Sequence, residues 1–466
     1  MMIRVVLYCT KYVSCMGDFT LKHTVIIKLT TAIAALLFLL SAGCQTSAPQ
    51  ASAAPTPTPL APSEISVRAE DCALDAADLV ATLERTHPLF LAEPYPEAYL
   101  AAREAFLAGV PNCQTQADFR LAVSLYLNSL NDGHTGVRRQ SNAFAPSYAQ
   151  IRVAALGSDL FILDDDGHLT SETITVVGGV PVADIFSVVD AYFPAENQTA
   201  KDASHSKRML NRDLLALAGC VLTEDAVTVT IDDGGQTRQQ SVPFGEEPLL
   251  RVNYYSEETA VSCERMGDVF YIDFNECDTG KALNAVCREL KSALREGVSR
   301  VIVDARDNPG GNSNACEKIL NTMGMRVPSY GVIRRNSPLA NEQRGYGRKE
   351  GFVEHSRSLD GTKQNPDISL VVLVNDGTFS SATMLAVWVQ DGKLGRVVGY
   401  PSANAPTSYG DILNYTLSRT GVEVIMSHKQ FQRPDANADQ TTLTPDVFVP
   451  YGEDALEAAL ALLGAS

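Results

Sequence analysis

Three groups of residues have the chemistry for nucleophilic attack on a carbonyl group. The first is the corner Gly377-Thr378-Phe379-Ser380, which separates an apolar run from a predicted helix. A serine hydroxyl there stands beside the positive N-terminal end of the helix, where main-chain N–H groups can stabilise developing negative charge. On this stretch alone, a helix N-cap is the commoner role of a serine such as Ser380. Whether Ser380 is instead a nucleophile therefore depends on the other two groups.

The second group is Pro309-Gly310-Gly311, which follows a predicted strand and forces an exposed turn with bare main-chain N–H groups. Such groups can bind an oxyanion, although this sequence is more often an ordinary turn. The third group is His134, in the loop Asp132-Gly-His-Thr. An imidazole in a polar loop can act as a general base near neutral pH, although a lone histidine is more often a surface residue.

The elements around these groups predict an α/β layer structure. Ile368 to Asn375 is a nearly unbroken apolar run, typical of a strand buried on both faces, and Ser381 to Gln390 follows it as a helix. From Asp268 onward, strands and helices alternate, which is the pattern of α/β layers. The remaining predicted elements here are strands at 269–274, 301–305 and 396–399, and helices at 280–294 and 314–323.

The chain before this region has two different patterns. Residues 71–130 show apolar positions at helical spacing, interrupted by prolines, and end at the cluster that contains His134. Residues 151–248 show shorter β-like runs between Asp-Gly and Gly-Gly turns, with a helix predicted over 209–217. We therefore expect a helical N-terminal segment followed by a small α+β insertion.

These fragments, in this order, resemble the tail-specific, or carboxyl-terminal processing, serine peptidases and their tricorn-like relatives. The resemblance spans about residues 71–463 and rests on five motifs. They are Asp132-Gly-His-Thr, Asp304-Ala-Arg-Asp-Asn-Pro-Gly-Gly, Thr378-Phe-Ser-Ser-Ala, Val398-Gly-Tyr-Pro with Tyr409-Gly-Asp411, and Thr444-Pro-Asp446. The family implies a crotonase-like (ClpP-type) α/β catalytic core, and the stretch Ile174 to Val182 resembles part of a PDZ domain.

The resemblance implies a division of the folded chain into three parts. Residues 67–136 form the helical N-terminal segment that carries the base. Residues 137–260 form the small α+β region, which is partly PDZ-like. Residues 261–466 form the α/β peptidase core.

The resemblance also implies roles for single residues. Ser380 matches the nucleophile of the family. The main-chain N–H of Ser381, together with that of Gly310 or Gly311, would form the oxyanion hole.

The base implied by the resemblance is a histidine. Family members with a Ser-Lys dyad have a lysine where this chain has Ala405. The tricorn-like branch uses a histidine with an acidic partner instead, and His134 lies where that histidine is expected. The acid corresponds to Asp439, with Asp411 as the alternative.

The composition limits the expected partners. The formal net charge is −17 at pH 7 and no Lys/Arg-rich block is present, which argues against nucleic acid. Seven cysteines follow Cys44 without a CxxC pair, which argues against a zinc site, and we expect no cofactor. The expected partners are a peptide or protein substrate and, through the N-terminus, a membrane.

Residues 1–43 have the pattern of a lipoprotein signal peptide, although residues 1–21 suggest a mis-assigned start. An apolar stretch, Thr30 to Leu40, follows two lysines and is itself followed by small residues before Cys44. Cys44 would be lipidated, and residues 44–66, rich in Ala, Pro, Thr and Ser, would form a flexible tether. We expect an extracytoplasmic protein anchored to a bacterial membrane on its periplasmic side. Gln45 is compatible with the outer membrane.

The function that the sequence favours is a serine-type peptidase acting on extracytoplasmic peptides or proteins. His134 would take the proton of Ser380, the oxygen would attack a peptide carbonyl, and water would later release the acyl-enzyme. Two other functions stay open. The same fold could bind a peptide or an apolar ligand without catalysis, or it could hydrolyse esters.

Overall fold

The structure, a computed structural model, describes residues 65–138, 144–249, 254–255 and 259–464. The predicted signal peptide, the lipidation site Cys44 and the tether as far as residue 64 lie outside these ranges. Within them, no helix has both the length and the apolar composition needed to cross a membrane.

A six-stranded sheet forms the centre of the C-terminal region. Neighbouring strands are parallel except for the first two in the chain, which form an antiparallel pair. The carboxyl ends of the two central strands therefore meet at one edge, which brings the loops after Asp304 and Val374 together. The order across the sheet is β20 (Val447–Phe448), β17 (Arg396–Gly399), β16 (Ser369–Val374), β11 (Arg300–Asp304), β10 (Val269–Phe274) and β9 (Val261–Met266).

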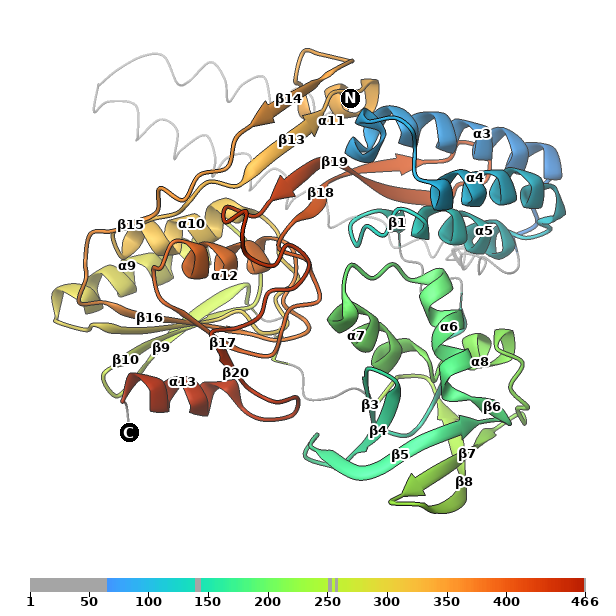
Figure 1. Cartoon of the computed structure of the whole chain (residues 1–466), viewed down its shortest axis with the longest axis horizontal. Helices are drawn as coiled ribbons and strands as arrows, with labels where there is room; N and C mark the ends of the chain where they lie inside the picture. Colours follow the sequence, from blue (N-terminus) through green and yellow to red (C-terminus); the bar gives the residue numbers. More distant parts are fainter. Residues whose placement is uncertain (1–64, 139–143, 250–253, 256–258, 465–466) are drawn as a thin grey trace, which may run out of the picture. The chain divides into compact units, whose positions relative to one another are not determined.

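Helices cover both faces of this sheet (Figure 1). Three lie on one face, namely α9 (Lys281–Arg295), α10 (Ser313–Thr322) and α12 (Ser381–Asp391), and α13 (Ala455–Leu463) lies on the other. In β11, Val301 and Val303 pack under the three helices, whereas Ile302 packs against α13. Burial on both faces explains why these strands are continuously apolar, and the predicted α/β structure is confirmed.

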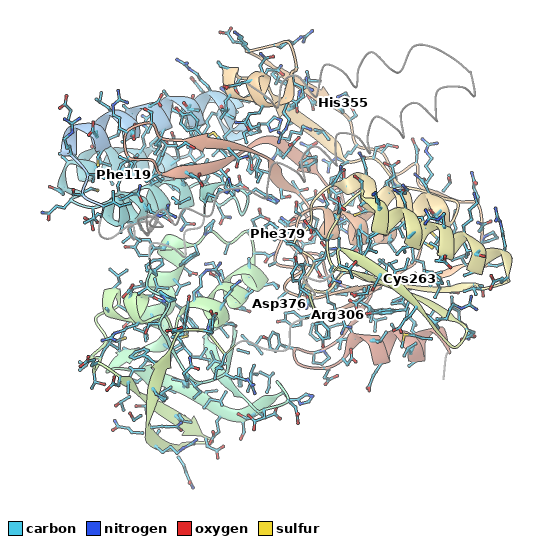
Figure 2. All side chains as sticks on the ribbon, turned by 180° about the vertical axis from the view of Figure 1, so that it is seen from behind. Phe119, Cys263, Arg306, His355, Asp376 and Phe379 are labelled. Carbon is cyan, nitrogen blue, oxygen red and sulfur yellow. The ribbon has the colours of Figure 1, made fainter. Side chains whose placement is uncertain are left out.

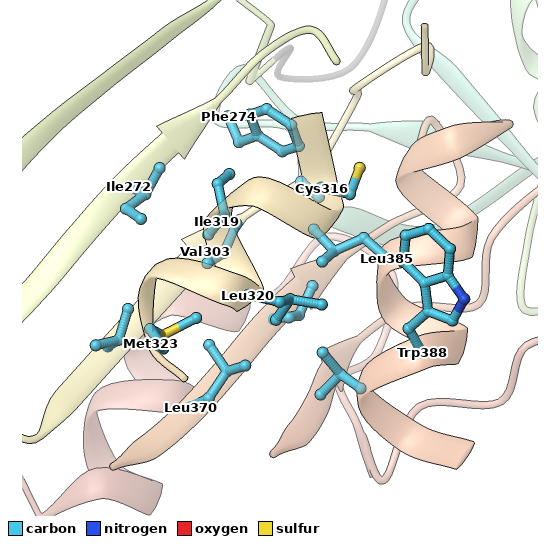
Figure 3. Packing of buried hydrophobic residues seen from close by; sticks show 14 of the residues in the cluster. Ile272, Phe274, Val303, Cys316, Ile319, Leu320, Met323, Leu370, Leu385 and Trp388 are labelled. Atoms are coloured by element: carbon cyan, nitrogen blue, oxygen red, sulfur yellow. The ribbon is translucent and has the colours of Figure 1, made fainter. Parts of the chain in front are cut away.

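Figure 3 shows the layer between the sheet and two of these helices. Ile272 and Leu370 come from the strands, Leu320 comes from α10, and Leu385 points from α12 toward α10; all belong to one buried cluster. This packing fixes the position of the first turn of α12 relative to the sheet, because close-packed protein interiors are hard to compress.

A second, five-stranded sheet connects the core to the N-terminal helices. It contains β1 (Gly136–Val137), β13 (Gly331–Arg335), β14 (Phe352–His355), β18 (Ser408–Thr416) and β19 (Glu423–Gln432). The helices α3 (Ala69–Thr86), α4 (Glu97–Gly109) and α5 (Gln116–Asn128) share a buried cluster with β18 and β19. The loop that carries His134 lies between α5 and β1, so both of its ends are held by packed elements.

The region between these parts is an antiparallel sheet with three helices, as an α+β insertion should be. Its helices are α6 (Val182–Tyr192), α7 (Gln198–Arg208) and α8 (Arg212–Leu217), of which only the last was predicted. α8 starts at 212 rather than 209 because the Asn211 side chain caps it, accepting hydrogen bonds from two main-chain N–H groups. The strands are β2 (Tyr148–Ala149), β3 (Val153–Leu156), β4 (Asp159–Leu163), β5 (Leu169–Val177), β6 (Val180–Pro181), β7 (Ala226–Asp233) and β8 (Gln236–Gly245).

Candidate active site

Ser380 lies in the loop between β16 and α12 and has a strained main chain. Its φ and ψ are 52° and −122°, which residues with a β-carbon rarely adopt. It occupies the N-cap position of α12, but its side chain makes no capping hydrogen bond. Its main-chain N–H donates instead to Oδ1 of Asn404 at 2.9 Å. The capping role that the sequence allowed is therefore not the role of this hydroxyl.

The glycine turn after β11 touches Ser380 directly. A β-carbon on Gly310 would lie 2.6 Å from the β-carbon of Ser380, and one on Gly311 would lie 2.6 Å from the carbonyl oxygen of Cys277. Their φ angles are 97° and 129°. Only glycine combines these angles with such close approach. Figure 2 shows Arg306, Asp376 and Phe379 near one another, on the loops that meet at this edge of the sheet.

The main-chain N–H groups around Ser380 differ in their availability. The N–H of Gly310 already donates to Oδ1 of Asn308 at 2.8 Å, which favours Gly311 over Gly310 as the predicted glycine donor. Gly311 and Ser381 are the remaining candidates. Their segments are tied together, because the Ser381 hydroxyl donates to the Gly311 carbonyl at 2.8 Å.

Asp132 fixes the loop that carries His134. Although its burial raises the pKa of this carboxyl, hydrogen bonds from His87 and Thr135 bring the pKa well below its usual range. His87 accepts a main-chain hydrogen bond at Nδ1, so its Nε2 carries the proton. The oxygens of Asp132 accept hydrogen bonds from His87 Nε2 (3.1 Å), His134 N–H (2.9 Å), the Thr135 hydroxyl (2.5 Å) and the Ser427 hydroxyl (2.7 Å).

The imidazole of His134 is shielded from solvent and makes no hydrogen bond to the described residues. Its side chain is 12% exposed, and its ring lies against that of Phe379, with 4.8 Å between the ring centres. Burial lowers the pKa of His134, partly opposed by the charge of Asp132. The ring is therefore neutral near pH 7 and can accept a proton.

Glu196, in the loop between α6 and α7, is a carboxylate that the sequence reading missed. Its Oε1 lies 4.0 Å from Nδ1 of His134 and accepts the N–H of Gly133 at 3.0 Å. Its Oε2 accepts hydrogen bonds from Asn404 Nδ2 at 2.6 Å and from the N–H of Ala405 at 2.8 Å. Burial raises the pKa of Glu196 to about 7, opposed by these hydrogen bonds. One carboxylate thus connects the His134 loop to the amide that holds Ser380.

The two acids predicted from the sequence make their contacts elsewhere, and neither forms an ion pair with His134. Asp439 folds onto its own loop, where Oδ1 accepts the N–H and hydroxyl of Thr441, both at 2.8 Å. Asp411 pairs with Lys429 at 2.6 Å and with Arg344 at 3.0 Å. Among the described residues, the carboxylates within 4.0 Å of a His134 nitrogen are instead Asp132 and Glu196.

Asp132, His134 and Glu196 could also be considered as metal ligands. Each offers one ligand atom, and these atoms lie within 4.8 Å of one another. However, four hydrogen-bond donors already occupy the oxygens of Asp132. The cluster is therefore better explained as the support of an imidazole.

Ser380 and His134 line one cleft of about 680 Å³. Gly311 and Ser381 line it as well, so the nucleophile, base and oxyanion candidates all border the same space. Its other walls carry apolar side chains, including Tyr330, Met384, Ile412, Ile425 and Phe431.

Comparison with known proteins gives a consistent result for the core. Residues 265–449 match peptidase family S41. A probable CtpA-like serine protease of Staphylococcus saprophyticus is 26% identical over 177 residues, and one of Staphylococcus epidermidis is 24% identical over 177 residues. Each alignment covers 37% of this chain, which spans only 30% of the length of these relatives.

A solved structure extends the likeness beyond the core. The crystal structure of mature CPAF has a TM-score of 0.57 to this chain, with 14% sequence identity, over 85% of this chain and 95% of that one. At this identity the likeness concerns the fold alone. It nevertheless extends beyond residues 265–449, because it covers 85% of this chain.

Proposed function

We propose that this chain, whose residues 265–449 match peptidase family S41, is a serine-type peptidase that hydrolyses peptide bonds of peptides or proteins. The observation that carries the proposal is the shared cleft of Ser380 and His134. One wall of this cleft carries Ser380, whose main chain is strained and whose hydroxyl does not cap α12. His134, whose imidazole is neutral and shielded from solvent, lines the same cleft. In the finer classification we propose a crotonase-like (ClpP-type) core.

In the proposed reaction, His134 accepts the proton of the Ser380 hydroxyl as the oxygen attacks the peptide carbonyl. Neither ring nitrogen is engaged by another described residue, so the imidazole is free to form this hydrogen bond when substrate arrives. The imidazolium then gives its proton to the departing amine. Water enters and repeats the sequence on the acyl-enzyme, which regenerates the hydroxyl.

The negative oxygen of the tetrahedral intermediate needs donors that are already in place. The N–H groups of Gly311 and Ser381 fit this role because neither donates to another main-chain group of the described residues, and Ser381 starts α12. Removing one such donor typically lowers the rate by about 10²–10³. The apolar walls at Met384 and Phe431 favour substrates with an apolar side chain beside the cleaved bond.

A fluorophosphonate probe tests the nucleophile. We expect wild-type protein to be labelled and Ser380→Ala not to be. Ser313→Ala is the matched control, because Ser313 lines the same cleft and should leave labelling intact. Equal labelling of wild type and Ser380→Ala, or none under conditions that label a known serine hydrolase, would favour a binding protein. Turnover of short esters without cleavage of any peptide in a library would favour an esterase.

We also propose that the protein is anchored outside the cytoplasm by a lipid on Cys44. The proposal is supported by the apolar stretch and small residues before this cysteine. Growth with an alkyne fatty acid should label the wild-type protein but not Cys44→Ser. Recovery of unlabelled wild-type protein in the soluble fraction would contradict it.

A further inference from the structure

Arg208, the last residue of α7, carries a guanidinium group that pairs with no acidic side chain of the described residues. The group stacks on the ring of Phe193, with 4.4 Å from Cζ to the ring centre. One nitrogen donates a long hydrogen bond of 3.3 Å to the Ser204 hydroxyl. Within the described ranges, no carboxylate oxygen lies within 4.0 Å of it. Burial lowers the pKa of Arg208 to about 10, so the group is still charged at neutral pH.

A neighbouring arginine shows what a satisfied guanidinium looks like here. Arg212, in α8, also lies over an aromatic ring, that of Phe244, at 5.3 Å. Its nitrogens donate to the carbonyl oxygens of Glu224 at 2.7 Å and Thr223 at 3.2 Å. Acidic residues outnumber basic ones by 55 to 38 in this chain. A shortage of carboxylates therefore does not explain why no described acidic side chain pairs with Arg208.

Arg208 lines two cavities. The smaller, of about 320 Å³, is largely apolar, with Phe144, Tyr148, Tyr192 and Leu214 in its wall. The larger, of about 710 Å³, is also lined by Gly133, Pro309 and Phe379, which border the catalytic cleft too. Arg208, which has no acidic partner among the described residues, therefore stands between an apolar cavity and the immediate surroundings of Ser380.

We propose that Arg208 binds the carboxylate of a peptide ligand whose neighbouring apolar side chain enters the smaller cavity. A partly buried cation is costly unless an anion with matching hydrogen-bond geometry joins it, and the planar guanidinium matches a carboxylate in two parallel hydrogen bonds. The carboxylate is either an acidic side chain or the C-terminus. That the ligand is a peptide rests on the proposed function, whereas the carboxylate preference rests on Arg208 alone.

Binding to the Ser380→Ala variant tests this without turnover. Calorimetry would compare two pairs of peptides that differ in one negative charge. The first pair is acetyl-Ala-Ala-Phe-Glu-amide and its Gln analogue. The second is acetyl-Ala-Ala-Leu-Phe as the free acid and as the amide. We expect one acidic member to bind on the order of tenfold or more tighter than its neutral partner.

Adding Arg208→Gln should reduce that ratio to below about twofold, whereas the matched variant Arg212→Gln should keep it. The pair that responds identifies the source of the carboxylate. Thermal unfolding verifies that each variant is folded, and the comparison of isosteres on the parent protein needs no change at Arg208. Equal binding within both pairs, or a preference that survives Arg208→Gln, would overturn the proposal. If fluorophosphonate labelling failed, only the proposed peptidase activity would be refuted, because the carboxylate preference is measured by binding.

Discussion

Oε1 of Glu196 lies 4.0 Å from Nδ1 of His134, although the two residues belong to different parts of the chain. His134 follows the N-terminal helices, whereas Glu196 comes from the α+β insertion. The other oxygen of the same carboxylate accepts a hydrogen bond from Asn404, whose Oδ1 in turn holds the N–H of Ser380. The insertion therefore reaches the candidate base and the candidate nucleophile through one side chain.

Glu196→Gln should lower kcat by roughly 10- to 100-fold with little change in KM, because Glu196 positions other groups rather than binding substrate. Both oxygens of the Glu196 carboxylate accept hydrogen bonds. In a glutamine one of these oxygens becomes an NH₂ group, which faces a donor and cannot accept its hydrogen bond. The wild-type rate should also fall as pH drops through about 7, where Glu196 gains a proton. This limb should be absent in Glu196→Gln. A variant that keeps it would show that another group is titrating.

The stability of the protein should depend on the ionisation of Glu196 in the opposite direction from the rate. Because burial raises the pKa of folded Glu196 to about 7 from an ordinary value of 4.5, the folded state holds a proton that the unfolded state releases first. Its contribution to the free energy of unfolding is full below the ordinary value and is lost as pH rises toward 7. Urea unfolding at several pH values should show this loss in wild type but not in Glu196→Gln.

His134→Ala should reduce the rate of fluorophosphonate labelling and of peptide cleavage by roughly 10²–10⁴-fold, the usual contribution of a general base. Since burial lowers the pKa of His134 below 6.5, the neutral form should persist above that pH and be lost in more acidic solution. His355→Ala is the control, because His355 lies exposed on β14. Full labelling of His134→Ala would remove the imidazole from the mechanism.

Gly310→Ala should abolish activity, because the added methyl group would lie 2.6 Å from the β-carbon of Ser380. The variant should also unfold more easily by about 1–3 kcal/mol, the usual cost of a strained main chain. Gly347→Ala separates the two effects. Its φ of 70° is also positive, but a β-carbon there meets nothing within 4 Å. Equal activity losses in both variants would assign the effect to backbone strain alone.

The local signals could place Ser380 after a buried strand and the glycines in a turn, whereas their roles came from the resemblance carried by the ordered motifs. The apolar run before Ser380 marks a strand buried on both faces, and Pro-Gly-Gly marks a turn of special φ, whichever parts of the chain surround them. His134 could be proposed because it lies in a polar loop directly after a helical pattern. The structure brings these three features to one cleft, as the resemblance implied.

Glu196, the carboxylate beside His134, could not be found in the same way. Glu196 lies between two helices that the sequence reading did not predict, in a stretch without a recognisable motif. Its importance arises only when folding brings it to Gly133 and Ala405. Asp439 had the right chemistry and the right distance from the Pro-Asp motif, but hydrogen bonds within its own loop hold its carboxylate. Short-range competition of this kind is common for aspartate in turns.

Asp439→Ala therefore decides between the acid proposed from the sequence and the one found in the structure. We expect peptide cleavage to stay within about twofold of wild type, since none of the contacts of this carboxylate reaches His134. The cost should appear in stability instead, at about 1 kcal/mol, because the N–H groups of Thr441 and Thr442 lose their acceptor. Hydrogen bonding to those groups lowers the pKa of Asp439, so this stabilisation is present above its ordinary pKa and lost as pH falls. Parallel kcat measurements on Asp439→Ala and Glu196→Gln make the comparison direct. A large loss in the first variant with none in the second would restore Asp439 as the partner of the base.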